Sequence, residues 1–200
     1  MTGDIMEYEK KEWNKNSHHI LIKNEKEKNN EVVLRIAKQS DAENMHAIMR
    51  SVYDGLEDKS IYVCDDLEYV QTHIEKNGLG VVACNSSDEI VASFLLRFPD
   101  NSDDNLGRDI GLSEEELARV VHMETAVVIP KYRGRHLQLL MLDYAEQLID
   151  RSKYDILLAT VSPDNPASYK TFERNGYKRM LTKEKYVGLQ RHIYMKTLQK

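Results

Sequence analysis

A basic turn between two regular segments is the first feature of the sequence that could do chemistry. The stretch Lys131–Arg135 follows an apolar run that ends at Pro130, and an amphipathic helical pattern begins directly after it. The first N–H groups of a helix have no partners within it, and the helix dipole favours an anion there. Basic side chains add positive charge, so the pattern predicts a phosphate-binding turn. A solvated strand-to-helix turn is the alternative that this stretch alone leaves open.

A second segment, residues 165–177, has the marks of a short helix with a defined start and end. Asn165 stands at the N-cap position and Pro166 at the first helical position, where a missing N–H is harmless. Asn175 and Gly176 favour a left-handed end to the helix. Neither segment contains G-x-x-x-x-G-K-[ST] or G-x-G-x-x-G, so the common nucleotide-binding loops are excluded.

These two segments, in this order, resemble the GNAT acetyltransferase superfamily. Residues 130–138 are similar to the loop with which that family binds the pyrophosphate of acyl-coenzyme A, and residues 165–177 are similar to its next motif, with matching spacing. The predicted elements from Val32 to Leu198 also follow the family's order. The resemblance implies a mixed α/β (α+β) GNAT fold, in which a central, mostly antiparallel mixed sheet carries helices on both faces.

The resemblance also implies direct transfer of an acetyl group from acetyl-coenzyme A to a primary amine of a small molecule or peptide, in a ternary complex without a metal. The strand before the turn would pair with the pantetheine amides as an added strand pairs with a sheet edge. One of its N–H groups could hold the thioester oxygen. The residues implied to bind the coenzyme are Ala126, Val127, Val128, Arg133, Gly134, Arg135, His136, Leu137, Gln138, Asn165 and Phe172.

Three side chains depart from the family pattern. His136 and Gln138 replace the two small residues of the loop, where a bulky side chain must point away from a bound pyrophosphate. We expect His136 to be exposed. Phe172 stands where many members carry a tyrosine that protonates the leaving thiolate, and phenylalanine has no proton to donate. Tyr169 is the candidate acid in its place, and a thiolate that leaves unassisted is the alternative. A packing role is the alternative for the Tyr169 side chain itself.

Glu124 is the candidate general base. An alkylamine has a pKa of about 10.4 and is largely protonated at neutral pH, so a base beside the acceptor is useful. Glu124 lies in the strand before Pro130, where the family commonly places such a carboxylate. His122 alternates with it, faces the same side of the strand and is the second choice. A carboxylate that only positions the substrate is the alternative.

A run of acidic residues, here called the acidic segment, stands just before that strand. Between Asp100 and Glu116, seven acids occur with a single arginine, Arg108. Such a run usually forms a solvated face. The alternative is a border of the acceptor site that attracts a cationic amine, such as a polyamine, an aminoglycoside or a lysine side chain.

Apolar periodicity and turn signals predict the elements that must position these residues. Ser40 and Glu43 have capping-box spacing before a helix whose apolar face runs from Met45 to Val52. The other predicted helices cover residues 66–76, a short stretch from Ser113, the stretch from the basic turn to about residue 151, and residues 165–175. The predicted strands cover residues 32–36, 80–84, 90–98, 120–129, 156–161, 177–181 and 192–198.

Composition limits the class of protein. The chain has 200 residues, of which 41% are hydrophobic, enough for one domain with a core. Residues 1–30 are polar, so we expect a loosely ordered arm with at most one edge strand before a GNAT domain at 31–200. A net charge of −5 argues against a nucleic-acid partner.

The sequence also bears on location. Two cysteines cannot form a disulfide framework, no apolar stretch is long enough to cross a bilayer, and the first residues do not resemble a signal peptide. We therefore expect a cytoplasmic protein with no membrane partner. A homodimer is implied by family habit alone.

Two other functions stay open. A catalytically silent GNAT-fold module that binds acyl-coenzyme A or regulates a partner is suggested by His136, Gln138 and Phe172. An unrelated nucleotide-binding protein would explain the basic turn alone, and it predicts a preference for ATP over coenzyme A.

Overall fold

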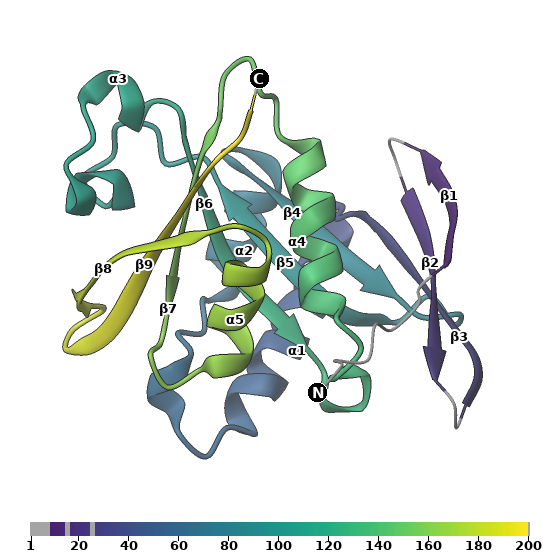
Figure 1. The fold of residues 1–200 in the computed structure, drawn as a ribbon. Coiled ribbons are helices and arrows are strands. Elements are labelled where there is room, and N and C mark those ends of the chain that lie inside the picture. Colours follow the sequence, from purple (N-terminus) through teal and green to yellow (C-terminus); the bar gives the residue numbers. More distant parts are fainter. Residues whose placement is uncertain (1–8, 15–16, 25–26, 200) are drawn as a thin grey trace, which may run out of the picture.

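The computed structural model describes residues 9–14, 17–24 and 27–199. Within this part of the chain, nine strands form one sheet in the order β1-β2-β3-β4-β5-β6-β7-β9-β8, with helices on both faces (Figure 1). Neighbouring strands are antiparallel except β6 and β7, which are parallel. The expected mixed, mostly antiparallel sheet is therefore confirmed.

The elements have the following bounds. The strands are β1 (Glu9–Asn14), β2 (Ser17–Asn24), β3 (Glu27–Ile36), β4 (Gly78–Cys84), β5 (Ile90–Arg97), β6 (Val120–Val128), β7 (Ile156–Val161), β8 (Lys178–Lys185) and β9 (Leu189–Thr197). The α-helices are α1 (Ala42–Asp54), α2 (Leu67–Glu75), α3 (Glu114–Leu117), α4 (Leu137–Leu148) and α5 (Pro166–Arg174). Short 3₁₀ helices are η1 (Gln39–Asp41), η2 (Lys59–Ile61), η3 (Leu106–Ile110) and η4 (Pro130–Tyr132).

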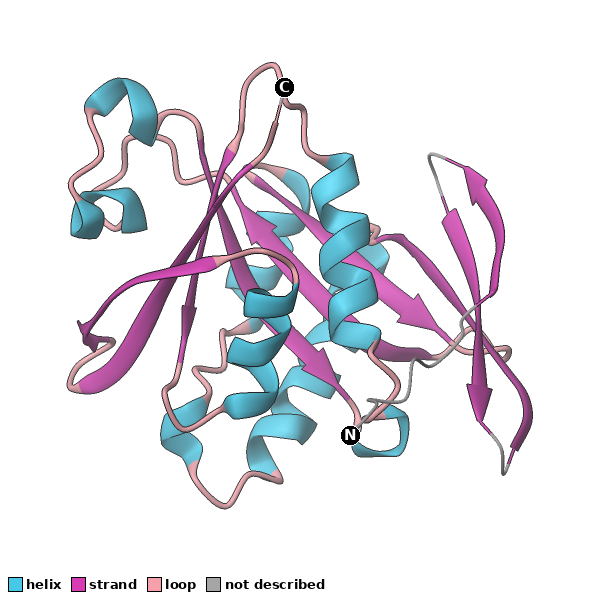
Figure 2. Cartoon of the chain, viewed as in Figure 1, coloured by secondary structure: helices cyan, strands magenta, loops and turns pink. Residues whose placement is uncertain are grey.

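Alternation along β4 shows how one sheet carries helices on both faces (Figure 2). Val81 and Ala83 belong to a core cluster with residues of α4 and α5, whereas Val82 and Cys84 belong to a second cluster with residues of α1 and α2. Successive side chains of a strand point to opposite faces. Because both faces are covered, this strand is an unbroken apolar run rather than an alternating one.

Side-chain caps fix where three of the helices begin. The carboxylate of Asp66 accepts a hydrogen bond from the N–H of Tyr69 at the start of α2. Ser113 caps α3 in the predicted capping box. Asn165 caps α5 through the N–H of Ser168, as its place before a proline predicts.

The predicted cap at Ser40 is wrong, because α1 begins after a turn of 3₁₀ helix. The residue that makes the contacts is Asp41, whose Oδ2 accepts from the N–H of Lys38 at 2.7 Å and from the guanidinium of Arg35 at 2.6 Å. The hydrogen bond from Arg35 holds the pKa of Asp41 below its usual range. An ion pair with β3 thus fixes the entry to α1.

The N-terminal strands differ from the sequence-based expectation. Where we expected an arm with at most one edge strand, β1 and β2 form an antiparallel hairpin, and β2 continues the sheet from β3. β3 runs across residue 30, where we placed the boundary between arm and domain. The sequence of β1, EKKEWN, has almost no apolar alternation, so periodicity does not reveal it. Charged side chains of this kind are typical of edge strands.

Helix α4 and the last hairpin also differ in extent from the prediction. α4 ends at Leu148 because Ile149 has an extended backbone with φ −71° and ψ 128°. β8 and β9 are longer than predicted and meet in a turn where Tyr186, Val187 and Gly188 all have positive φ. The second half of β8 is polar, which conceals it from an apolar pattern.

The parallel pair β6–β7 is short. Its register begins at Val120 with Ile156 and ends at His122 with Leu158. Beyond that point the two strands run on without pairing and diverge (Figure 1). The divergence leaves a gap in the middle of an otherwise continuous sheet.

Gly78→Ala tests the close approach of α2 and β5 at the start of β4. A Cβ at Gly78 would meet the backbone oxygens of His73 and Leu96, whereas a Cβ at Gly55 would only touch that of Ser51 at 3.4 Å. We expect Gly78→Ala to lower the free energy of unfolding by about 1–3 kcal/mol through overpacking. Gly55→Ala should change it by less than about 0.5 kcal/mol. Urea denaturation measures both, and equal effects would contradict the packing described.

Candidate active site

The gap between β6 and β7 holds a pocket of about 350 Å³. The N–H of Ile129 donates to the oxygen of Val91 on β5 at 3.1 Å. Because backbone groups alternate sides along a strand, those of Val128 and Ala126 turn away from β5 toward the gap, while those of Val127 turn toward β5. Two of the three residues predicted to meet pantetheine therefore present backbone groups to the gap.

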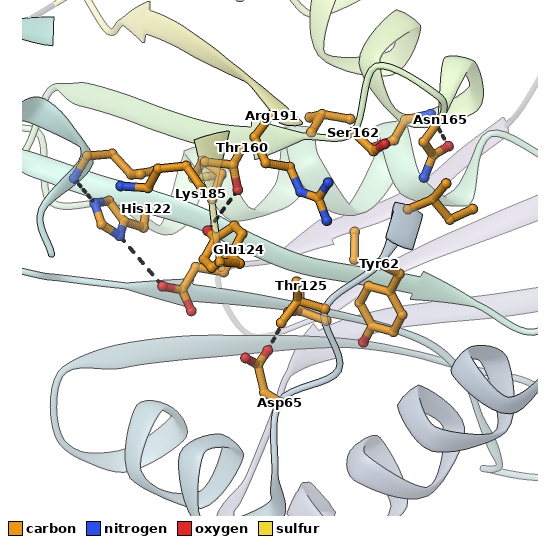
Figure 3. A pocket seen from close by; sticks show the side chains of 18 of the residues that line it. Tyr62, Asp65, His122, Glu124, Thr125, Thr160, Ser162, Asn165, Lys185 and Arg191 are labelled. Atoms are coloured by element: carbon orange, nitrogen blue, oxygen red, sulfur yellow. Dashed lines mark hydrogen bonds and ion pairs between the residues drawn. The ribbon is translucent and has the colours of Figure 1, made fainter. Parts of the chain in front are cut away.

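A β-bulge aims two polar side chains of β6 into this pocket. The register between β5 and β6 shifts between Phe94 and Leu96, so Glu124 and Thr125 both lie opposite Leu95. A bulge turns side chains away from the regular alternation. Both Glu124 and Thr125 line the pocket (Figure 3).

Three groups surround the carboxylate of Glu124. The hydroxyl of Tyr69 donates to Oε2 at 2.7 Å. Nε of Arg97 and Nδ1 of His122 each lie 3.6 Å from Oε1. The predicted base therefore lies in the pocket as a held, partly accessible carboxylate.

His122 positions this carboxylate. The backbone N–H of Leu106 donates to Nε2 of His122 at 3.0 Å, so Nε2 carries the lone pair and Nδ1, which faces Glu124, carries the proton. Burial lowers the pKa of His122, which keeps the ring neutral at neutral pH. Because the lone pair of Nε2 already accepts the hydrogen bond from Leu106, the neutral ring has no free nitrogen with which to take a proton from an acceptor amine.

A second carboxyl group, that of Asp65, lies on the same wall. The hydroxyl of Thr125 donates to Asp65 Oδ2 at 2.6 Å (Figure 3). Burial raises the pKa of Asp65. No described cation lies within ion-pair distance of it, in contrast to Glu124, which has Arg97 beside it.

The β8–β9 hairpin closes the pocket on the side of β7. The Tyr186 hydroxyl lies 2.9 Å from Oγ1 of Thr160. Arg191 donates to the backbone oxygen of Ser60 in η2 at 2.6 Å. Lys185 forms an ion pair with a carboxylate of η3. Segments distant in the sequence thus meet around one cavity.

The basic turn has the backbone shape of an anion site. Gly134, with φ 74°, and His136, with φ 55°, are both left-handed, and α4 begins directly after His136. His136 makes no side-chain cap and is exposed, as predicted. Nε of Arg133 donates to the backbone oxygen of Val128 at 3.1 Å and so joins the turn to β6. A histidine here adopts a conformation that favours glycine, at some cost in backbone energy.

The turn and the pocket are adjacent but distinct. The turn residues do not line the pocket in the described structure. The guanidinium of Arg135 lies over the ring of Tyr132, 5.0 Å from its centroid. Leu137 is buried, so only its backbone N–H is available to a ligand at the helix start.

The starts of α4 and α5 contribute polar groups to the pocket. Nε2 of Gln138 donates to Oγ of Ser168 at 3.1 Å, and both residues line the pocket together with Asn165. Phe172 is 3% exposed and also lines it. The structure thus brings these predicted residues together with Glu124 and Ala126.

Tyr169 is not brought to the pocket. Its ring meets the edge of the His192 ring at a centroid distance of 6.2 Å and packs against the core. It does not belong to the pocket lining of the described structure. This placement favours the packing role that the sequence left open for Tyr169.

The acidic segment borders the pocket, but several of its charges are paired. Asp104 pairs with Arg97 at 2.6 Å, Glu114 pairs with Arg108 at 2.8 Å, and Asp109 pairs with two lysines of β8. Burial opposes ionisation of Asp109, but the lysines outweigh it and lower its pKa. These pairs reduce the attraction that the segment could exert on a polyamine.

Among residues 9–14, 17–24 and 27–199, no three histidine, cysteine or acidic side chains come together as metal ligands. None of the helices described is both long and apolar enough to cross a membrane.

Comparison with known proteins decides the family. The model of the acetyltransferase (GNAT) family matches residues 43–177, which is more than half of the chain. The chain belongs to the GNAT acetyltransferase family. The matched region includes β6, the basic turn and the segment around α5. None of the curated proteins matches the sequence.

Solved structures of GNAT proteins share the fold at low sequence identity. NAA60 from Arabidopsis thaliana, in complex with a bisubstrate analogue, is 12% identical with a TM-score of 0.67, covering 83% of this chain and 97% of that chain. The putative acetyltransferase yncA from Salmonella typhimurium, with its cofactor acetyl-CoA, is 13% identical with a TM-score of 0.62, covering 84% and 95%. An N-acetyltransferase from Staphylococcus aureus Mu50 is 15% identical with a TM-score of 0.62, covering 84% and 99%.

Sequence reasoning missed much of the pocket wall. Tyr69, Asp65 and Arg191 come from α2, the loop before it and β9, and no motif joins them. Arg97 is the residue that the sequence could have pointed to, because a charged side chain stands there at the end of an apolar, buried strand. Such a residue needs a partner, which here is Asp104.

The protonation of His122 can be tested by NMR. We expect ¹⁵N shifts that show a proton on Nδ1 and none on Nε2 from pH 7 to pH 8. Because burial lowers its pKa, any titration midpoint should lie below the ordinary value of about 6.5. A doubly protonated ring at pH 7, or a proton on Nε2, would contradict the arrangement around Glu124.

Proposed function

We propose that this protein transfers an acetyl group from acetyl-coenzyme A to a primary amine, directly within a ternary complex. Membership in the GNAT family supports acetyl transfer from acetyl-coenzyme A. The observation that carries the rest is the carboxylate of Glu124, which stands in a pocket at the gap between β6 and β7.

The coenzyme would bind along the gap. The start of α4, with the left-handed residues Gly134 and His136 before it, would hold the pyrophosphate. Backbone groups of Ala126 and Val128 would pair with the pantetheine arm, which brings the thioester to the pocket. The structure of the putative acetyltransferase yncA, which shares this fold and contains acetyl-CoA, supports this arrangement.

Glu124 would take the proton of the acceptor amine. Its carboxylate is held by Tyr69, Arg97 and His122 and remains partly accessible. The free amine then attacks the thioester carbonyl, the bond from carbon to sulfur breaks, and the thiolate leaves. We assign the role of proton donor to the thiolate to neither Phe172 nor Tyr169. Phe172 has no hydroxyl, and Tyr169 lies outside the pocket lining.

We also predict a division of the chain after residue 30, a cytoplasmic location and a homodimer.

The turn is tested by Gly134→Val, with Gly111→Val as its matched control. Both glycines have a left-handed backbone, with φ 74° and 76°, and a Cβ at either meets nothing within 4 Å. Backbone strain from valine should therefore be similar, on the order of 1–2 kcal/mol. Calorimetry should show at least about tenfold weaker binding of acetyl-coenzyme A for Gly134→Val only, which corresponds to about 1.4 kcal/mol. Equal affinities for the two variants would remove the turn from the coenzyme site.

Glu124→Gln tests the proposed base. The change keeps the shape of the side chain but removes its proton affinity, so kcat/KM for an amine acceptor should fall by on the order of 10²-fold or more. Affinity for acetyl-coenzyme A should stay within about twofold, since the coenzyme contacts are elsewhere. Glu115→Gln, on the exposed surface of α3, serves as the control. Full activity of Glu124→Gln would overturn the assignment.

The second candidate function is the silent GNAT-fold module, which Phe172 and the bulky Gln138 in the pocket favour. It predicts binding of acetyl-coenzyme A without release of coenzyme A in the presence of any amine. Acetyl-coenzyme A calorimetry followed by a turnover assay with a panel of amines separates the two functions.

A further inference from the structure

Arg191 is a buried cation that faces the pocket without a carboxylate partner. It is 4% exposed and lies on β9. Its two terminal nitrogens donate to backbone oxygens, those of Gln190 at 2.9 Å and Ser60 at 2.6 Å. Within the described residues, these are its hydrogen bonds, and no acidic side chain lies within ion-pair distance of it.

The other arginine and the lysine that line the pocket are neutralised. Arg97 pairs with Asp104 at 2.6 Å and also lies beside Glu124. Lys185 pairs with Asp109 at 2.6 Å. Arg191 is therefore, among the described pocket-lining side chains, the cation without a carboxylate partner, and its nearest aromatic contact is the ring of Tyr186, whose centroid lies 5.8 Å from Cζ.

An uncompensated buried charge costs free energy. Burial lowers the pKa of Arg191, although an arginine stays protonated in proteins. A guanidinium has five N–H groups, and the two backbone bonds leave others free for a ligand. A carboxylate is the anion whose planar shape matches that fork.

The opposite side of the pocket carries acids. Figure 3 shows the guanidinium of Arg191 pointing into the cavity from the β9 side, with Glu124, Thr125 and Asp65 on the β6 side. Glu124 and Asp65 both present carboxyl groups there. The cavity thus has a free positive group on one wall and acids on the other.

We infer that the acceptor is an amine that also carries a carboxylate, such as a free amino acid, with Arg191 binding the carboxylate while the amino group faces Glu124. This inference rests on the proposed function. The amine nitrogen forms a bond to the acetyl carbon, the bond from that carbon to sulfur breaks, and coenzyme A leaves as the thiolate. One proton of the ammonium group passes to Glu124 before the attack, and the second, lost from the nitrogen as the amide forms, is taken up by the thiolate.

A polyamine fits this pocket less well. Its several positive charges would include one near Arg191, and like charges repel strongly where water is excluded. The uncharged amide of a peptide would leave the charge of Arg191 uncompensated. A carboxylate is the group that removes this deficit.

The experiment compares matched acceptors on the full chain. The standard L-amino acids are each assayed at saturating acetyl-coenzyme A beside their carboxamides and their decarboxylated amines, with release of coenzyme A as the signal. For the amino acids that react, kcat/KM should exceed that of both counterparts by on the order of 30-fold or more, as expected for a buried charge that gains its partner. Equal or faster reaction of carboxamides or decarboxylated amines would overturn the inference and leave the proposed function standing.

Variants then separate ligand binding from a structural role. Arg191→Gln should raise KM for the reactive amino acid by on the order of 30-fold and leave KM for its decarboxylated amine within about twofold. Arg191→Lys keeps the charge but loses the fork, so its KM should lie between the two. Arg179→Gln removes an exposed arginine from the neighbouring strand β8 and is the matched control. If Arg191 only holds Ser60 in place, KM for both acceptors will rise equally, and the inference fails.

A binding measurement distinguishes a failure of the carboxylate site at Arg191 from a failure of the proposed acetyl transfer. Calorimetry of the same amino acids in the presence of coenzyme A detects the acceptor site without turnover. Binding that Arg191→Gln abolishes, with no release of coenzyme A from acetyl-coenzyme A, would keep the carboxylate site and overturn the proposed function. If no amino acid binds and none is acetylated, the inference is overturned.

Discussion

The early end of pairing between β6 and β7 is the constraint on which the rest of the site depends. The strands share a register only from Val120 to His122, after which the sheet opens. A β-strand that loses its neighbour exposes backbone N–H and C=O groups, which must find other partners. Here the backbone groups of Ala126 face the pocket and those of Val128 face the gap, where the Val128 oxygen accepts from Arg133, and the opening leaves room for side chains from both strands.

The polar groups around Glu124 form one connected network rather than a set of separate contacts. Asp104 pairs with Arg97, which lies beside Glu124, and the backbone of Leu106 fixes the tautomer of His122. Asp104 and Leu106 both lie in the acidic segment, which connects β5 to β6. Part of a segment that looks like a solvated acidic face therefore supports the carboxylate of the site. Connected networks of this kind fix side-chain orientation at low dielectric, although Nε of Arg97 has no hydrogen-bond partner among the described residues.

The sequence predicted what depends on local pattern. The central strands, the caps of α3 and α5 and the position of the basic turn follow from spacing within a few residues, whereas Glu124 was chosen through the resemblance to a family. The predicted cap at Ser40 is wrong because Asp41 is held by Arg35 of β3, a contact that the capping-box pattern does not encode. Strand β1 was not predicted because an edge strand needs no apolar face to pack. The pocket wall was missed because its members meet only through tertiary packing, as Tyr69 does with Glu124 across 55 positions of sequence.

The division between backbone and side chains explains why the family can be recognised while the acceptor cannot be named from family membership. The groups that would hold the coenzyme are N–H and C=O groups of β6 and the start of α4, which any side chain can accompany if the backbone shape is kept. His136 illustrates this, because it adopts the left-handed conformation usual for glycine and directs its ring to solvent. The proposed acceptor side is different, since Arg191, Asp65 and Glu124 would act through their own charges. Specificity would then depend on a few side chains that each come from a different element of the fold.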